Sequence, residues 1–293
     1  MKTKQLFLLA AATLIAASCS IKERRSDCLA PVNVHVNDFS VSQLDYPGTK
    51  TTSTVAAYNE VNAISLAFYT STGDEQYKAT QLRSAPAAYT TFGDFSLSLP
   101  MGSYTMVVVA YTTKDGSPFV LTSPTEAAYT GDHAYETFVS TQAVEISSTS
   151  AVELSATLER INAMLKIIST DGKTANANKV RMTLSAGARD FSPTSGLALT
   201  NSGFVNTVGI SATVGNASTS STAFFLASDE QTMNVTIDVL DSDGNSVSHR
   251  VVPDVPFKRN RITQLSGSLY TNDGVSSAFQ LSTDWLTTYS DTF

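Results

Sequence analysis

The sequence is poor in the residues that most often carry chemistry or covalent cross-links. Its 293 residues include only two cysteines, one tryptophan and three histidines. Two cysteines, both close to the N-terminus, cannot build a disulfide-stapled scaffold. Charged residues make up only 15% of the chain, and the formal net charge is −7. An acidic chain without a basic run argues against nucleic acid as a partner.

Helical periodicity and long apolar runs are also scarce. Beyond residue 18, no apolar segment is long enough to cross a bilayer. No 3.6-residue periodicity persists over three turns, whereas threonine and aromatic residues, which fit a pleated sheet, are frequent. The chain that follows the N-terminal segment is therefore predicted to be all-β.

Residues 1–18 have the pattern of a lipoprotein signal peptide. Two lysines precede the uncharged run "QLFLLAAATLIAAS", whose last residue, Ser18, comes directly before Cys19. A basic region, a short apolar region and small residues at the cut site mark a secretory signal. The segment resembles the bacterial lipobox, in which cleavage between Ser18 and Cys19 accompanies addition of diacylglycerol and palmitate to the cysteine. Acylated Cys19 would bind a membrane, and the alternative is an unmodified Cys19 that follows an ordinary cleavage site.

Residues 19–30 are predicted to be a lipidated tether. The tether contains the pair Arg24 and Arg25, which is either a solvated charged spacer or a protease site, and Cys28, a lone thiol if Cys19 is acylated. We favour the spacer, because cutting after Arg25 would release only seven residues, about the length of one strand with no linker.

Alternation of apolar and polar residues at period two predicts strands along most of the remaining chain. Val32, Val34 and Val36 form one such pattern, and residues 64–68 and 180–184 form others. Strands of this kind bury one face and expose the other, as in a β-sandwich.

Hairpins are predicted where turn residues separate strand patterns: one turns at residues 71–74, and two others need a closer description. In the first of these two, a strand over 95–99 leads through Pro100–Ser103 into a return strand that begins at Tyr104. The Gly-x-Tyr step at the start of this return strand predicts that the phenol of Tyr104 bonds back to the backbone, as in the corners of β-sandwiches.

The second hairpin turns at Asp243-Gly244. Asp241, Asp243 and Asn245 imitate the first ligands of a calcium loop, but the glycine precedes Asn245 and Val252 stands where the loop needs glutamate. A plain hairpin turn is therefore preferred to a calcium site.

A serine-rich stretch, "EISSTSAVEL", predicts a domain boundary near residue 150. It divides the mature chain into an N-terminal β-sandwich over 31–150 and a C-terminal β-sandwich over 151–293. Both lengths are within the usual range for a domain.

Motifs of catalysis are missing from the sequence. His35, His133 and His249 lie in three separate segments without metal-ligand spacing. The chain has no Gly-x-Ser-x-Gly elbow and no phosphate-binding glycine loop. We therefore predict no enzyme activity, no cofactor and no metal site.

The segment "VPFKRNRITQLSGSLY", residues 255–270, resembles the C-terminal signature of the fimbrillin superfamily of Bacteroidales, the proteins of type V pili. Further resemblance lies in "TLERINAMLKIISTDGK", which starts at residue 157, and in the start "CSIKERRSDC", which is similar to minor-fimbrium anchor lipoproteins. The residues that carry the signature are Arg160, Val255, Pro256, Arg259, Asn260, Thr263, Gly267, Asp284 and Trp285.

The resemblance implies two transthyretin-like β-sandwich domains in tandem and no catalysis. In that superfamily, stalk subunits lose their first strand to an arginine-specific protease, and a strand of a neighbouring subunit fills the groove. Anchor subunits keep their lipid and hold the fibre to the outer membrane. Because no arginine lies between Arg25 and Arg83, the first strand of this chain would be retained, which favours an anchor or accessory subunit in contact with other fimbrial subunits.

Three alternatives remain beside this interpretation. The chain could be a proteolytically matured, polymerising pilus subunit. It could be a surface lipoprotein that binds host or bacterial glycans through the tyrosine-rich segment Tyr129–Tyr135. A lipid-anchored hydrolase with residues gathered from distant loops is the least favoured.

Overall fold

The computed structural model describes residues 29–42, 50–55, 57–114, 118–271 and 280–282. These ranges form nineteen strands and one short 3-10 helix, Pro86–Ala88, so the prediction of an all-β chain is confirmed. The strands before the middle of the chain are β1 (Leu29–Ser42), β2 (Lys50–Thr54), β3 (Ala63–Thr70), β4 (Glu75–Leu82), β5 (Asp94–Pro100), β6 (Gly102–Tyr111), β7 (Phe119–Ser123), β8 (Glu126–Tyr129), β9 (Thr137–Ile146) and β10 (Val152–Arg160). Those that follow are β11 (Ala163–Ser169), β12 (Lys179–Leu184), β13 (Asp190–Phe191), β14 (Phe204–Gly209), β15 (Thr219–Phe224), β16 (Glu230–Leu240), β17 (Ser246–Lys258), β18 (Ile262–Gly267) and β19 (Gln280–Ser282).

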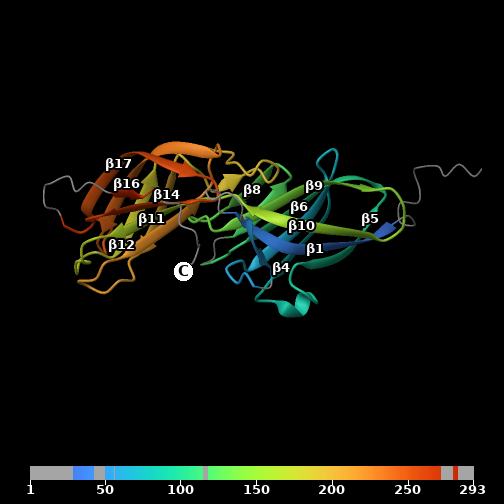
Figure 1. The fold of residues 1–293 in the computed structure, drawn as a ribbon, viewed down its shortest axis with the longest axis horizontal. Helices are drawn as coiled ribbons and strands as arrows, with labels where there is room; N and C mark the ends of the chain where they lie inside the picture. Colours follow the sequence, from blue (N-terminus) through green and yellow to red (C-terminus); the bar gives the residue numbers. More distant parts are fainter. Residues whose placement is uncertain (1–28, 43–49, 56, 115–117, 272–279, 283–293) are drawn as a thin grey trace, which may run out of the picture.

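The first sandwich is built from one long sheet that folds over on itself. Its order is β2-β1-β10-β9-β6-β3-β4, with β5 also paired to β1. Strands β9 and β10 pair through only two residue couples, at Glu159 and Arg160. This narrow join lets β1, β5 and β10 form one layer and β3, β4, β6 and β9 the other (Figure 1).

Strand β1 is an internal strand of its layer. It runs parallel to β10 on one side and antiparallel to β5 on the other. Val32 and Val34 are fully buried in the first core, as the period-two alternation predicts. Phe39 is buried there as well, because an irregularity between Val36 and Asp38 shifts the register of the strand. The first strand of the described chain is therefore integral to the sandwich.

Strands β3 and β6 are buried on both faces. Ile64, Leu66 and Phe68 point into the core shared with β1, whereas Ala67 and Tyr69 belong to a second core that continues into the C-terminal half. A strand covered on both sides reads as a continuous apolar run, which explains "AISLAFY" and "MVVVAY" in the sequence.

The predicted hairpin between residues 95–99 and the strand that starts at Tyr104 is wrong. Strand β5 pairs with β1, while β6 pairs with β3 and β9, so the two consecutive strands lie in different layers. The residues between them make a corner of the sandwich instead. At this corner the Tyr104 hydroxyl donates to the Pro100 carbonyl at 2.8 Å, which confirms the predicted contact of the phenol with the backbone.

The second sandwich has two four-stranded sheets. Their orders are β15-β11-β18-β19 and β14-β12-β16-β17. The hairpin of β16 and β17 is confirmed, and its turn is closed by Asp241, whose carboxylate accepts the backbone N–H groups of Asp243 and Asn245 at 2.9 and 2.8 Å. These contacts favour a turn over a calcium loop.

A small third sheet lies where the two halves meet. Its order is β13-β8-β7, so a strand from the second half extends a hairpin of the first. Phe119, Tyr129, Phe191 and Phe225 pack together there, with the Phe191 and Phe225 ring centroids 4.5 Å apart. One apolar core thus extends across both halves.

The passage from one sandwich to the other follows Arg160. Strand β10 pairs with β1 and β9 in the first sheet, and β11, which starts at Ala163, is the first strand of the second sandwich. The predicted boundary at residues 150 and 151 falls ten residues earlier, before β10. No helix of the described ranges is long and apolar enough to cross a membrane.

Replacing Phe39 by alanine should destabilise the first sandwich by about 3–5 kcal/mol, because the ring is fully buried between Phe138 and Tyr58. The matched control is Val251→Ala on β17, where the side chain is 56% exposed and the cost should be below about 0.5 kcal/mol. Urea unfolding of the full chain measures both costs. Equal shifts of the two midpoints would contradict the internal position of β1.

Candidate functional site: the interdomain junction and its pocket

A buried ion pair lies at the end of β10, where the chain leaves the first sandwich. The Arg160 Nη2 and Glu136 Oε1 atoms are 2.5 Å apart, and the side chains are only 7% and 3% exposed. The Tyr58 hydroxyl donates to the same Glu136 oxygen at 2.6 Å and accepts from Arg160 Nη2 at 3.0 Å. Burial raises the pKa of the Glu136 carboxyl above its ordinary value, and Arg160 and Tyr58 oppose the shift.

This cluster is tied to the second sandwich through asparagines. Arg160 Nη1 donates to Asn260 Oδ1 at 3.3 Å, and the Asn260 N–H donates to the Asn162 carbonyl at 2.9 Å. Asn260 has φ = 59°, a left-handed conformation that asparagine tolerates better than most residues. Asn162 Oδ1 in turn accepts the N–H of Thr137 at 3.0 Å. The structure therefore brings together Arg160 and Asn260, two signature residues that are 100 positions apart.

The other described signature residues lie close by in the second sandwich. Arg259 pairs with Asp229 at 2.8 Å and donates to the Ser195 carbonyl at 3.0 Å. The Thr263 hydroxyl donates to the Pro256 carbonyl at 2.9 Å, which links β18 to the end of β17.

Val255 packs in the core, and Gly267 takes part in backbone hydrogen bonding. Val255 is 1% exposed and belongs to the core that spans both halves. The Gly267 carbonyl accepts the N–H of Thr170 at 2.9 Å. This part of the signature thus maps onto packing, turn and sheet contacts of the second sandwich, and Gly267 lies at the end of β18 that is remote from the junction.

Several predicted site residues lie outside the described residues. These are Ser18, Cys19, Arg24, Arg25, Cys28, Asp284 and Trp285. The predicted signal peptide and most of the tether lie outside them as well.

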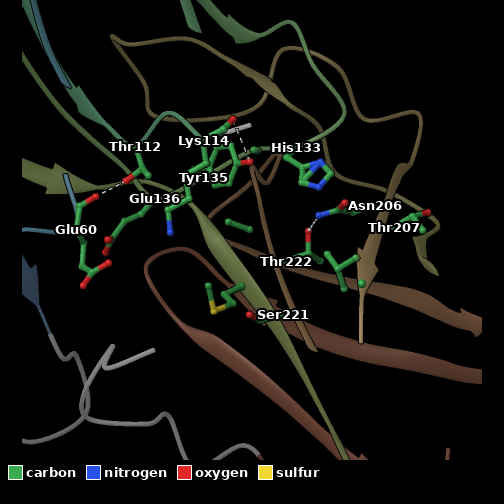
Figure 2. Close-up of a pocket in the computed structure, with 15 residues that line it drawn as sticks. Glu60, Thr112, Lys114, His133, Tyr135, Glu136, Asn206, Thr207, Ser221 and Thr222 are labelled. Atoms are coloured by element: carbon green, nitrogen blue, oxygen red, sulfur yellow. Dashed lines mark hydrogen bonds between the residues drawn. The ribbon is translucent and has the colours of Figure 1, made fainter. Parts of the chain in front are cut away.

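Next to the ion pair, a cavity of about 490 Å³ opens between the two sandwiches (Figure 2). The first half contributes Glu60, residues from 112–114 and the segment 133–136. The second half contributes Met164, the end of β14 and three residues of β15. Its volume is within the range of about 300–1,000 Å³ that is usual for ligand pockets.

The two walls of the pocket meet at a short backbone contact. Ala134 and Ala223, both in the lining, form an isolated antiparallel bridge between the halves. Because each wall comes from a different sandwich, the pocket exists only when both are docked.

Two residues of the lining carry a buried polar atom without a hydrogen-bond partner among the described residues. Within the described ranges, the buried atoms Asn206 Oδ1 and Glu136 Oε2 accept no hydrogen bond. The amide nitrogen of Asn206 is engaged, since it donates to the Thr222 hydroxyl at 2.7 Å (Figure 2).

The tyrosine-rich segment is only partly available for a ligand. Tyr129 is 3% exposed and donates toward the Thr112 carbonyl at 3.4 Å within the core, so it offers no surface ring. His133 and Tyr135, in contrast, line the pocket with ring centroids 6.0 Å apart. The sequence indicated this segment but not which rings face outward.

A second polar cluster, on the outer face of β1, was not predicted. His35 Nδ1 lies 2.9 Å from Asp94 Oδ1, and its Nε2 lies 3.2 Å from Glu153 Oε2. His35 therefore bridges β5 and β10 across β1, and the hydrogen bonds to Asp94 and Glu153 raise its pKa. Among the described residues, no group of three or more histidine, cysteine or acidic side chains is arranged to hold a metal ion.

Residues 44–287 match the model of a family described as a family of unknown function (DUF6562). The chain belongs to this family. No curated protein sequence matches this DUF6562 member.

Solved structures similar to the DUF6562 chain include proteins of Bacteroides and Porphyromonas species. A candidate adhesin from Bacteroides ovatus is 12% identical over 89% of this chain and 96% of its own, with a TM-score of 0.54. A candidate adhesin from Bacteroides thetaiotaomicron is 11% identical over 88% of this chain and 97% of its own, with a TM-score of 0.52. The fimbrial anchor protein Mfa2 from Porphyromonas gingivalis is 10% identical over 87% and 95%, with a TM-score of 0.50. At these identities the likeness establishes a common two-sandwich fold.

Replacing Arg160 by methionine should cost about 3–5 kcal/mol near pH 7.5, because it leaves the buried Glu136 carboxylate without its cation. The cost should shrink near pH 5, since unpaired Glu136 then folds with its proton bound. Adding Glu136→Gln to this variant should recover much of the loss near pH 7.5. Denaturant unfolding at both pH values tests the pair, and a loss that is independent of pH would contradict it.

Replacing His35 by asparagine should flatten the dependence of stability on pH. The raised pKa means that protonated His35 stabilises the folded chain fully below about pH 6.5, and that this contribution disappears as the pH rises through the folded-state pKa. The difference in unfolding midpoint between wild type and His35→Asn should therefore be larger near pH 5.5 than near pH 8.5. If the difference in midpoint does not change with pH, protonation of His35 does not stabilise the fold through its contacts with Asp94 and Glu153.

Proposed function

We propose that the protein is a non-catalytic, lipid-anchored accessory or anchor subunit of a fimbrial assembly at the cell surface, with a role in adhesion. Its signal sequence and Cys19 support export and acylation. The fold that it has in common with the fimbrial anchor protein of Porphyromonas gingivalis and with candidate adhesins supports the fimbrial context.

The observation that carries the proposal is the position of β1. This strand begins at Leu29, four residues after Arg25, and pairs on both sides within the first sandwich. A cut after Arg25 would leave β1 in place, so the groove that a neighbour's strand could fill would stay closed. This supports an anchor over a polymerising subunit.

The next arginine is a poor alternative for proteolytic activation. Arg83 donates to the carbonyls of Val61 and Val55 at 2.7 and 2.6 Å, and its guanidinium lies 4.1 Å from the Phe92 ring centroid. Cleavage there would also separate β1 to β4 from the rest of the sandwich.

Anchoring at Cys19 would hold the first sandwich near the membrane. Ten residue steps separate Cys19 from Leu29, and a fully extended chain of that length spans at most about 35 Å. Other subunits could pair with an open sheet edge: among the described strands, β4 pairs only with β3.

The test is the mass of the N-terminal peptide of the protein purified from envelopes of its own host. We expect a peptide that starts at acylated Cys19 and extends through Arg25. A free N-terminus at Ser26 or beyond would indicate release and a polymerising subunit. An unmodified Cys19 would contradict attachment to the membrane through this residue.

A matched pair of variants separates lipid from protease. Cys19→Ala should move the protein out of the membrane fraction because the acyl chains, worth about 0.8 kcal/mol per buried CH₂ group, are lost. Replacing Arg24 and Arg25 by glutamine should leave the protein in the same fraction as wild type. The mass of the mature protein should change only by the difference between the substituted side chains. Retention of Cys19→Ala in the membrane would contradict the anchor.

A further inference from the structure

We propose that the pocket between the two sandwiches is a binding site for a short neutral saccharide. The proposal goes beyond the fimbrial role and does not depend on it, because the pocket is formed entirely by described residues of the folded chain. The chemistry of the lining favours such a ligand.

The lining offers polar groups as well as rings. Asn206 and Glu136 line the pocket, but Asn206 Oδ1 and Glu136 Oε2 have almost no exposed area, so these two atoms are not the ones that meet a ligand. The polar contacts of a ligand fall instead to the partly exposed hydroxyl side chains of the lining.

Two hydroxyl side chains of the lining can make hydrogen bonds to a ligand. Thr207 and Ser221 line the pocket from β14 and β15 (Figure 2), and neither side chain is hydrogen-bonded to another described residue. A hydroxyl donates one hydrogen bond and accepts others. Neighbouring hydroxyl groups of a sugar also donate and accept, and therefore match this lining.

The charges of the lining favour a neutral ligand. The Glu136 carboxylate is paired with Arg160, and the other two charged residues of the lining, Glu60 and Lys114, have opposite signs. Because both signs are present within one pocket, neither an acidic nor a basic ligand gains from the site as a whole.

Aromatic rings provide the apolar part of the site. The rings of His133 and Tyr135 are tilted by 36° to each other at the pocket. Tyr129 packs against Tyr135 from the core side, with centroids 5.8 Å apart and nearly perpendicular planes. Tyr135 is thus supported in place, as a ring that contacts the C–H face of a sugar needs to be.

The test uses the full chain and four disaccharide probes: lactose, cellobiose, mannobiose and N,N′-diacetylchitobiose. Glucuronic acid serves as the anionic control and glucosamine as the cationic one. Ligand-observed saturation-transfer NMR should detect at least one disaccharide and neither charged control. Binding of a charged control alone, or of none of the probes, would overturn the proposal.

Two variants on β14 locate the binding. Gly209 lines the pocket and an added Cβ meets no atom within 4 Å, so Gly209→Tyr can be accommodated and should weaken binding by about tenfold or more through occupation of the pocket. Val205→Tyr is the control, because Val205 is 46% exposed on the same strand and lies outside the lining. Equal binding by wild type and Gly209→Tyr would overturn the site.

Thr207→Val removes only one hydroxyl and keeps the branched shape, so it covers the case in which Gly209→Tyr fails to fold. Loss of a neutral hydrogen bond should weaken binding about threefold to tenfold. Unchanged affinity in Thr207→Val, with a folded protein by circular dichroism, would count against the pocket. A failure of these tests leaves lipidation at Cys19 untouched, so the two proposals fail separately.

Discussion

Burial of the layer of β3, β6 and β9 on both faces is the constraint on which the rest of the structure depends. One face of this layer packs on β1, β5 and β10, and the other carries Tyr69, Val107 and Val109 into the core of the second half. Apolar burial contributes about 25 cal/mol per Å², and here it is gained on both sides of the same strands. The two sandwiches are consequently joined by a continuous core as well as by one chain crossing.

Directional contacts then fix how the halves meet. The buried pair of Arg160 and Glu136 would be costly if either partner moved, because a lone charge in this environment lacks water. Asn260 links the pair to the second sandwich. Apolar packing alone would let the two halves slide against each other, whereas these hydrogen bonds form in only one arrangement. The ion-pair cluster therefore specifies how the halves meet and with it the shape of the pocket.

The two proposals place different functions in different parts of the molecule. The N-terminal segment would attach the protein to a membrane through Cys19, with β1 held firmly within the first sandwich. The pocket lies beside the ion pair, at the interface of the halves. An anchored protein with a recognition site at the interface of its halves would present that site close to the membrane.

The sequence by itself determined the all-β class, the turn at Asp243-Gly244 and the backbone contact of Tyr104, because periodicity, turn chemistry and corner motifs are local. Only the tertiary structure decided which strands pair. Strand β5 follows a hairpin-like pattern but joins β1, and His35 meets Asp94 and Glu153 through strands far apart in the sequence. The pocket could not be predicted from the sequence either, since its walls come from two sandwiches. Alternation shows that a residue is buried, but it does not show which residues cover it.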